Sequence, residues 1–501
     1  MVKKSPLYFV FALCISFLCV VAPFRGQAQS PSSTVSTGQQ NLSSTVDIRQ
    51  LKKDIPLLMK KAAIPGMSIA VIRGGKLVWT GVFGVANAAT QQPVTEATVF
   101  EAASLSKPVF AYGVLKLVDQ GKLNLDTPLN KYLGNNYDVV DDPRINLITA
   151  RRVLSHTSGF PNWRDFDHTK NLLIHFTPGE KWSYSGEGMV YLAKVVEKIT
   201  GLSLEDFMQQ MVLRPLGMTS SSYIWQDRYD SLKVYRHDAL GDTSGRWRPS
   251  GGHAQALKEG GNAAASLSTN AVDYSKFILA LLNGTGLKKA TWEQMLNPQI
   301  RTNEKYPQVA WGLGVGLETM PEGEYFWHWG DNGDGKAYVT AFLPGRDAVV
   351  YFANSANGLS ITREILAEGI GGEHPALLQL GYERYNSPSR VLLSAILEKG
   401  AVPALETYRQ QRSSDTLQKI TEADINTLGY ELLRLKKWND AIEVFRQNTL
   451  DFPNSYNAWD SFAEAYMDKG DKASAIKYYQ KSLDLNPGNE NGKEQLKKLG
   501  E

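Results

Sequence analysis

The sequence predicts an α+β domain followed by an all-α domain, and two observations carry this prediction. Strand patterns stand at both ends of one long segment, at 67–83 and 325–354, with apolar stripes of helical period between them. A sheet that takes strands from both ends of a segment and packs against its helices is an α+β arrangement. The second observation is a pattern that recurs at an offset of 34 residues near the end of the chain. That offset is typical of stacked helical hairpins.

The N-terminus has the three regions of a secretory signal peptide. Two lysines precede a mostly apolar run at 7–24, and small and polar residues follow up to Ala28. We therefore expect residues 1–28 to be a signal peptide cleaved near Ala28, which makes the protein secreted or periplasmic. An uncleaved anchor is the alternative. Residues 29–46 are rich in Ser, Thr and Gln, which is typical of a flexible linker.

Charge and cysteine content exclude several classes of function. The chain has 54 basic and 51 acidic residues, and removing residues 1–28 takes away three basic residues and no acid. A formally neutral mature chain gives no reason to expect nucleic acid or an anionic membrane as partner. Both cysteines, Cys14 and Cys19, lie in the apolar run. The mature chain therefore has no thiol for a disulfide, a metal site or a nucleophile.

The first domain is expected at 47–375, and its elements follow in order. A Gly74–Gly75 turn joins two strands, and Gly201 stops a helix whose apolar stripe begins near Met189. The predicted strands are 67–73, 76–83, 325–329, 336–343 and 348–354, and the clearest predicted helices are 105–121 and 188–200.

The final part of the chain has a different pattern. Leu428, Ala441 and Pro453 recur 34 residues later as Phe462, Ala475 and Pro487. These positions resemble the tetratricopeptide repeat, so we expect such repeats at 421–498. Because two repeats seldom bury enough apolar surface alone, residues 376–420 are expected to supply a linker and a degenerate helical pair. An unrelated helical hairpin is the alternative.

Ser104 and Lys107 form the most informative pair in the sequence. They are three residues apart at the start of a predicted helix, so both side chains lie on one face. Burial and the positive end of the helix dipole both favour the neutral amine of Lys107, which can accept the hydroxyl proton of Ser104. Ser106 points elsewhere on this helix. The pair predicts a serine nucleophile with its base.

Two further segments can complete such a site. Tyr184 lies in a turn-rich segment directly before a helix, where its side chain can project into a cleft as a proton-transfer group. His328, Trp329 and Gly330 end a strand before a glycine-rich turn that begins at Asp331. Such a strand can offer a backbone N–H to a substrate oxygen.

Taken in order, these segments resemble the serine β-lactamase-like family, which includes class C β-lactamases, D-alanyl-D-alanine carboxypeptidases, D-aminopeptidases and related esterases. The resemblance covers about residues 50–370, and it implies a β-lactamase/transpeptidase-like domain with an antiparallel sheet flanked by helices. Its markers are Pro65–Gly66, Phe100, Ser104–Lys107, Leu123–Pro128, Leu154–Gly159, Pro178–Gly179, Tyr184–Gly186, Pro215–Met218 and His328–Gly330.

The resemblance implies a role for each candidate residue. Ser104 is the acylated nucleophile, and Lys107 and Tyr184 exchange its proton. His328 and Gly330 belong to the third motif, where His328 replaces a lysine that is common in the family. The oxyanion donors are the backbone N–H groups of Ser104 and Asp331.

Two departures from the family pattern shift the expected substrate. The second motif usually ends in an asparagine that holds a substrate amide, and here that position is Gly186. His328 is mostly uncharged at neutral pH, so it supplies no fixed cation for a substrate carboxylate. Lys336 is the other candidate cation, although a solvated lysine is the more ordinary interpretation. Esters, D-residue peptides or other small amides are therefore favoured over penicillins.

Alternative chemistries have less support. His156 does not indicate a Ser-His-Asp triad, because the chain has no G-x-S-x-G elbow. The histidine spacing matches no metal motif, so we expect neither metal nor cofactor. The expected partners are a small-molecule or peptide substrate and a protein bound by the repeats, with no membrane span after signal removal. The main alternative function is a catalytically weak protein that recognises penicillins or peptides and scaffolds or signals through its repeats.

Overall fold

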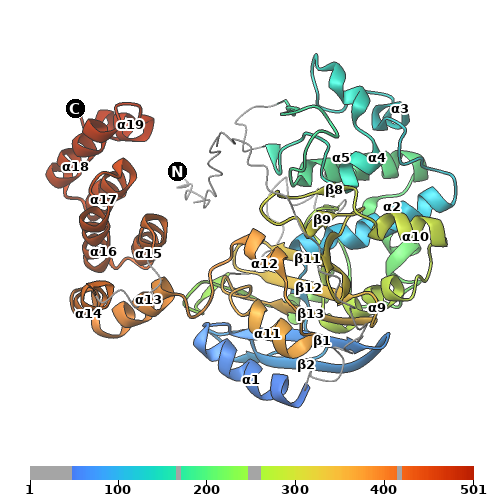
Figure 1. The fold of residues 1–501 in the computed structure, drawn as a ribbon, viewed down its shortest axis with the longest axis horizontal. Helices are drawn as coiled ribbons and strands as arrows, with labels where there is room; N and C mark the ends of the chain where they lie inside the picture. Colours follow the sequence, from blue (N-terminus) through green and yellow to red (C-terminus); the bar gives the residue numbers. More distant parts are fainter. Residues whose placement is uncertain (1–47, 165–170, 246–260, 414–419, 501) are drawn as a thin grey trace, which may run out of the picture. The chain divides into compact units, whose positions relative to one another are not determined.

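The computed structural model describes residues 48–164, 171–245, 261–413 and 420–500, so the predicted signal peptide and linker lie outside the described residues. Its centre is a nine-stranded sheet in which all neighbouring strands are antiparallel (Figure 1). The predicted α+β domain with an antiparallel sheet flanked by helices is confirmed. In spatial order the strands are β3 (Gln92–Pro93), β2 (Lys76–Asn87), β1 (Gly66–Arg73), β13 (Asp347–Ala353), β12 (Lys336–Phe342), β11 (Gly323–Asp331), β10 (Gly316–Met320), β9 (Val309–Trp311) and β8 (Ile300–Arg301).

The sheet joins the two ends of the domain. Strand β1 pairs with β13, with Met67 opposite Ala353, and also with β2 across the predicted turn. Gly74 and Gly75 have φ values of 54° and 72°, a left-handed conformation that glycine adopts without steric cost. Strands β1 and β13 are buried almost throughout because both faces of the sheet are covered.

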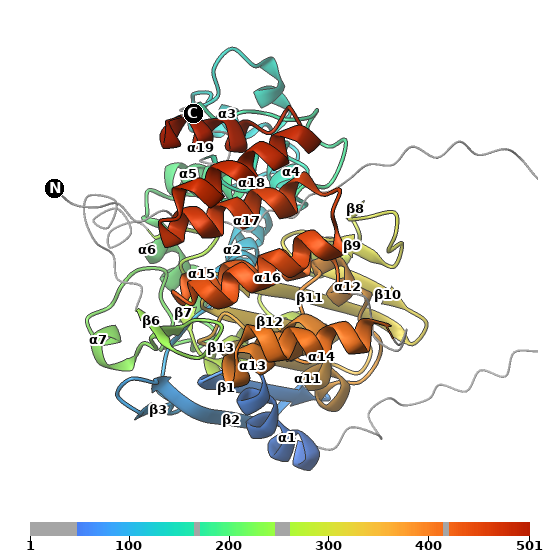
Figure 2. The ribbon, with the colours of Figure 1, turned by 90° about the vertical axis from the view of Figure 1, so that its left-hand side faces the viewer.

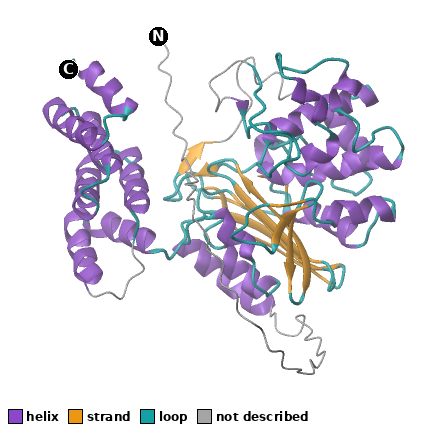
Figure 3. Cartoon of the chain, turned by 45° about the horizontal axis from the view of Figure 1, so that its top comes forward, coloured by secondary structure: helices purple, strands orange, loops and turns teal. Residues whose placement is uncertain are grey.

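Helices cover the two faces, as the secondary-structure colouring in Figure 3 shows. The helices α1 (Ile48–Lys61) and α11 (Thr362–Gly369) share one core with the aromatic face of the central strands. The opposite face packs on α2 (Ser106–Asp119), α5 (Gly186–Thr200) and α9 (Ala271–Leu282). The shorter helices of this domain are α3 (Leu129–Leu133), α4 (Ala150–Leu154), α6 (Leu204–Met208), α7 (Tyr229–Leu232), α10 (Lys289–Leu296) and α12 (Pro375–Leu380).

Local signals explain the two helices that carry candidate residues. Helix α5 begins where the Ser185 hydroxyl accepts a hydrogen bond from the backbone N–H of Gly188, and it ends at Gly201 with φ 70°. Helix α2 is preceded by a 3₁₀ turn, Ala103–Leu105, so Ser104 stands just outside the α-helix. Two small pairs lie outside the main sheet, β4 (Phe100–Glu101) with β7 (Ser268–Thr269) and β5 (Arg236–His237) with β6 (Thr243–Gly245).

The C-terminal part is a series of antiparallel helix pairs, seen one above another in Figure 2. The helices are α13 (Pro388–Lys399), α14 (Ala401–Ser413), α15 (Glu422–Arg434), α16 (Trp438–Asp451), α17 (Tyr456–Lys469), α18 (Lys472–Leu485) and α19 (Glu490–Leu499). One apolar core runs from Leu392 on α13 to Ala465 on α17, so the degenerate pair adds its helices to the same stack. Within the described ranges, no helix has both the length and the apolar character needed to cross a membrane.

Candidate active site

Ser104 is held on a strained turn that lies against β11, an interior strand of the sheet. The preceding residue, Ala103, has φ 48°, a left-handed conformation that costs a non-glycine residue about 1–2 kcal/mol. The buried Ser106 hydroxyl fixes this turn by donating to the Ala103 carbonyl oxygen at 2.5 Å and accepting from the backbone N–H of Leu267 at 3.0 Å. Ser104 remains partly exposed. The two serines therefore have different positions, since Ser106 lies in the core and Ser104 is partly exposed.

Lys107 lies beneath Ser104 and is completely buried. Its Nζ atom is 3.0 Å from Ser104 Oγ and 2.9 Å from the carbonyl oxygen of Ala264. Burial lowers the pKa of the Lys107 amine from 10.5 to about 7. A substantial fraction of the amine is therefore neutral near pH 7, and the neutral form can accept a proton from Ser104.

Tyr184 faces the same lysine from the segment that precedes α5. The Lys107 Nζ atom lies 4.7 Å from the centre of the Tyr184 ring. Burial raises the pKa of the Tyr184 hydroxyl well above its usual value, and the neighbouring Ser104 offsets only part of this rise. No other described residue lies in hydrogen-bonding geometry to the Tyr184 hydroxyl. Tyr184 is thus a neutral phenol with a proton to donate.

His328 belongs to the third motif, on β11, where its side chain is buried and uncharged. Burial and the nearby Lys107 lower the pKa of His328 from 6.5 to about 3. Its Nδ1 atom lies 2.7 Å from the carbonyl oxygen of Trp329. A carbonyl only accepts, so Nδ1 carries the hydrogen and Nε2 is the unprotonated nitrogen.

Gly330 allows β11 to pass directly against the turn that carries Ser104. A Cβ atom at Gly330 would lie 2.3 Å from the carbonyl oxygen of Ala102 and 3.2 Å from the Ala103 Cβ. Only a glycine fits there without moving backbone. Asp331 follows at the end of β11, opposite Lys336 on β12. The fold thereby places three motifs that are far apart in sequence around Ser104.

The family model described as Beta-lactamase matches residues 51–366, which is more than half of the chain. The chain belongs to the β-lactamase family. It is therefore a serine hydrolase of β-lactamase-related type, and the resemblance seen in the motifs is confirmed. A second model, Tetratricopeptide repeat, matches residues 456–489, which confirms that the C-terminal helices include such a repeat.

Relatives of this β-lactamase-family chain include esterases and penicillin-binding proteins. Esterase EstB of Burkholderia gladioli is 30% identical over 192 residues, which are 33% of this chain and 49% of that protein. Penicillin-binding protein 4* of Bacillus subtilis is 25% identical over 327 residues, which are 60% of this chain and 70% of that protein. The match to the esterase thus spans only about half of its length.

Solved structures with the same fold come from distant relatives. The octameric penicillin-binding protein homologue from Pyrococcus abyssi aligns with a TM-score of 0.54 and 23% identity, over 70% of this chain and 82% of that chain. The D-alanine carboxypeptidase AmpC from Burkholderia cenocepacia aligns with a TM-score of 0.54 and 19% identity, over 64% of this chain and 99% of that chain. At these identities the likeness establishes the fold.

The position of the second-motif asparagine is filled differently in this member of the family. A Cβ atom at Gly186 would lie 2.8 Å from both the Asn162 carbonyl oxygen and the Trp163 ring. The backbone N–H of Gly186 donates to the Asn162 side chain at 3.0 Å. Residues 162 and 163 therefore occupy the space that a larger residue at 186 would need.

The interpretation of Lys336 as a solvated lysine is wrong. Lys336 is 7% exposed, and its Nζ atom lies 2.5 Å from Asp331 Oδ1. The two charges offset each other within the hairpin. Because Asp331 and Lys336 are directly opposed in the register of β11 and β12, the antiparallel pairing was the signal that could have revealed the ion pair.

Sequence reasoning also missed the aromatic lining of the site and its support from outside the motifs. Trp311 lies 5.4 Å from His328 and 6.0 Å from Tyr184, measured between ring centres. Trp329 lies 4.7 Å from Tyr184 by the same measure. Tyr382, beyond the family-matched region, donates a hydrogen bond to Asp331 at 2.6 Å. Trp329 belongs to the third motif, whereas no local pattern marks Trp311 or Tyr382.

His156 packs beneath Tyr184. Its ring centre is 4.3 Å from that of Tyr184, and its Nδ1 atom accepts a hydrogen bond from the backbone N–H of Ser185 at 3.1 Å. Burial lowers the pKa of His156 well below 6.5, so the ring is neutral. These contacts give His156 a role in placing the second motif. No group of three or more potential metal ligands occurs among the residues that the structure describes.

Proposed function

We propose that this chain is an exported hydrolase that cleaves small esters through an acyl-enzyme at Ser104. The observation that carries the proposal is the buried Lys107 amine, 3.0 Å from Ser104 Oγ, with its pKa lowered to about 7. An amine in this state is a base matched to neutral pH.

The proposed reaction proceeds by two transfers of the acyl group. Lys107 accepts the Ser104 proton while Oγ forms a bond to the ester carbonyl carbon. The oxyanion accepts hydrogen bonds from the backbone N–H groups of Ser104 and Asp331. The C–O bond then breaks, and the alcohol leaves with a proton relayed from Lys107 through Tyr184. Water attacks the acyl-enzyme by the reverse proton route, and the acid leaves.

The charges around Ser104 favour an ester over a substrate with a carboxylate. His328 is neutral, and Lys336 is paired with Asp331. Gly186 offers no side chain to hold a substrate amide. The lining of Tyr184 and Trp329 presents ring surface instead, which suits an apolar acyl or alcohol group. The esterase among the relatives agrees with this substrate class.

Acylation of Ser104 is the direct test. Wild-type protein and Ser104→Ala are exposed to p-nitrophenyl butyrate and to a chromogenic β-lactam, and intact mass and product release are followed. We expect a butyryl adduct of about 70 Da and ester turnover in the wild type only, with much slower reaction of the β-lactam. Absence of any adduct would favour a protein that binds ligands without turning them over.

Export and a protein partner of the repeats complete the proposal. The charged, apolar and small-residue regions of 1–28 support export. Because a tetratricopeptide repeat is a common protein-binding unit, we infer a protein partner for the C-terminal helices. Fractionation of cells that express the full chain, followed by intact mass of the exported form, tests cleavage near Ala28.

A further inference from the structure

The segment after α12 reaches back to the third motif. Tyr382 donates its hydroxyl hydrogen to Asp331 Oδ2 at 2.6 Å. The other carboxylate oxygen of Asp331 accepts from Lys336 Nζ at 2.5 Å and from the backbone N–H of Gly333 at 2.8 Å. The Lys336 Nζ atom also lies 5.5 Å from the centre of the Tyr382 ring. The Asp331 carboxylate is thus held from three directions, and one of the three holding groups lies beyond the family-matched region, which ends at residue 366.

Tyr382 stands among the groups of the proposed reaction. Burial and the Asp331 carboxylate raise the pKa of Tyr382 well above its usual value, so the hydroxyl keeps its hydrogen and stays a donor. Trp329 is a further hydrogen-bonding neighbour of this side chain, and Tyr184 is close enough to affect its ionisation.

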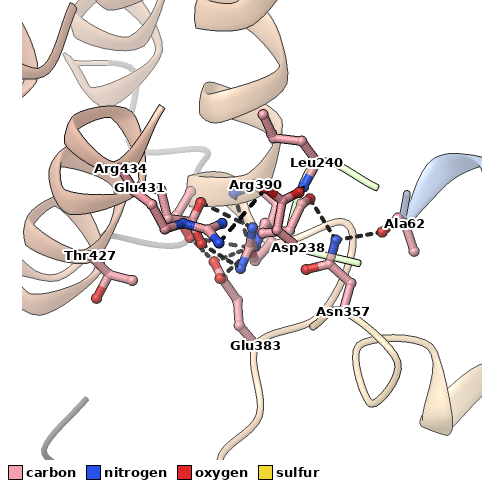
Figure 4. A network of polar contacts seen from close by, with 12 residues as sticks. Ala62, Asp238, Leu240, Asn357, Glu383, Arg390, Thr427, Glu431 and Arg434 are labelled. Carbon is pink, nitrogen blue, oxygen red and sulfur yellow. Dashed lines mark hydrogen bonds and ion pairs between the residues drawn. The ribbon is translucent and has the colours of Figure 1, made fainter. Parts of the chain in front are cut away.

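The residue next to Tyr382 is fixed by a polar network (Figure 4). Glu383 accepts hydrogen bonds from the hydroxyls of Ser387, at 2.6 Å, and Ser389. It also pairs with Arg390, at 2.8 Å, and Arg390 continues to Glu431 on α15 at 3.0 Å. Tyr382 therefore projects from a segment that is itself firmly anchored.

The turn after Asp331 is closed by a hydrogen bond from the Asn332 N–H to the Gly335 carbonyl oxygen and by the Asn332 side chain, which donates to Glu101 at 3.0 Å, but it contains two glycines. Gly333 adopts φ 79°, and Gly335 follows two residues later. Glycines leave the backbone free to change its dihedral angles. An oxyanion donor contributes its full effect only when its N–H already points to the place where charge develops. A small rotation at Asp331 would turn its N–H away.

We propose that Tyr382 is a positioning residue, which fixes the Asp331 carboxylate and thereby the direction of the Asp331 backbone N–H. This inference rests on the proposed function, in which that N–H is an oxyanion donor. The segment between the hydrolase domain and the helical repeats is then part of the active site.

The test compares two single-hydroxyl deletions on the same segment, Tyr382→Phe and Tyr385→Phe. Tyr385 packs in the same apolar core, and its backbone N–H donates to the Ser360 carbonyl oxygen, so it controls for loss of a tyrosine hydroxyl. With p-nitrophenyl butyrate we expect Tyr382→Phe to lower kcat by roughly tenfold, less than the 10²–10³ that follows loss of an oxyanion donor. KM should stay within about twofold, because the affected contact forms in the transition state. Tyr385→Phe should match the wild type.

Hydrogen exchange of the 329–336 segment gives a readout that does not depend on turnover. We expect faster amide exchange in Tyr382→Phe than in Tyr385→Phe or the wild type. Lower kcat together with faster exchange supports the proposal. Unchanged kcat, or a lower kcat with unchanged exchange, overturns it. If the wild type turns over no ester, the proposed function fails, and the exchange difference alone decides whether Tyr382 holds the turn.

Discussion

Replacing Lys107 by methionine should abolish turnover and, at the same time, stabilise the fold. Lys107 is fully buried, and its pKa falls from 10.5 to about 7. Each unit of pKa shift corresponds to about 1.4 kcal/mol, so the protonated amine costs the folded state on the order of 5 kcal/mol. Methionine removes that cost but loses the hydrogen bonds to Ser104 and Ala264, each worth about 1 kcal/mol. The net expectation is a gain of a few kcal/mol at or below pH 7.

The stability difference between wild type and Lys107→Met should depend on pH. Between pH 7 and 10.5 the unfolded Lys107 binds more proton than the folded one, so wild-type stability rises with pH across this window. The advantage of Lys107→Met should be complete below pH 7 and should shrink as pH approaches 10.5. Denaturant unfolding from pH 6 to 10, followed by tryptophan fluorescence, measures the difference. Ser104→Ala is the matched control because it is inactive yet keeps the lysine.

The activity of the wild type should follow the same titration. The value of kcat/KM for p-nitrophenyl butyrate should rise about tenfold per pH unit below pH 7 and level off above it, since only the neutral amine accepts the Ser104 proton. A stability difference between wild type and Lys107→Met that does not vary with pH would show that the pKa of Lys107 is not lowered in the folded protein. So would a rate profile whose rise continues to pH 10.

Three other substitutions test separate parts of the site. Tyr184→Phe should leave the unfolding midpoint nearly unchanged and lower kcat by roughly 10²–10⁴, as measured by ester hydrolysis, because it removes one proton donor; unchanged kinetics would exclude Tyr184 from the reaction. Gly330→Ala places a Cβ 2.3 Å from the Ala102 carbonyl oxygen, so thermal unfolding should show a loss of about 1–3 kcal/mol with little remaining activity; a fully active, stable variant would contradict the close approach. Gly186→Asn should destabilise the protein without creating β-lactam hydrolysis, because its Cβ meets Trp163 at 2.8 Å; efficient turnover of a chromogenic β-lactam would show that this space opens.

The predictable parts of the site are those that depend on the geometry of a short stretch of chain or on a periodic pattern of apolar residues. Ser104 and Lys107 are one turn apart, so chain geometry alone brings the side chains together. The sheet followed from strand patterns at both ends of the domain. The environment of Lys336 was misjudged because burial is a property of the packed hairpin, in which Tyr382 covers the lysine from a position far along the chain. One contact between residues so far apart in the chain produces no periodic pattern in the sequence.

Two unfavourable features of the site lie at Ser104, and each is compensated by a contact that is already formed. Ala103 is held at φ 48° by the hydrogen bonds of Ser106, whose own backbone carbonyl accepts from the Tyr223 hydroxyl at 2.7 Å. The buried Lys107 amine donates hydrogen bonds to the Ala264 carbonyl oxygen and to Ser104 Oγ, which offset part of the cost of its burial. Because these contacts involve no substrate atom, the nucleophile and its base reach their working geometry before a substrate arrives. The free energy of folding therefore offsets the cost of the strained turn, so that substrate binding energy can be used to stabilise the transition state.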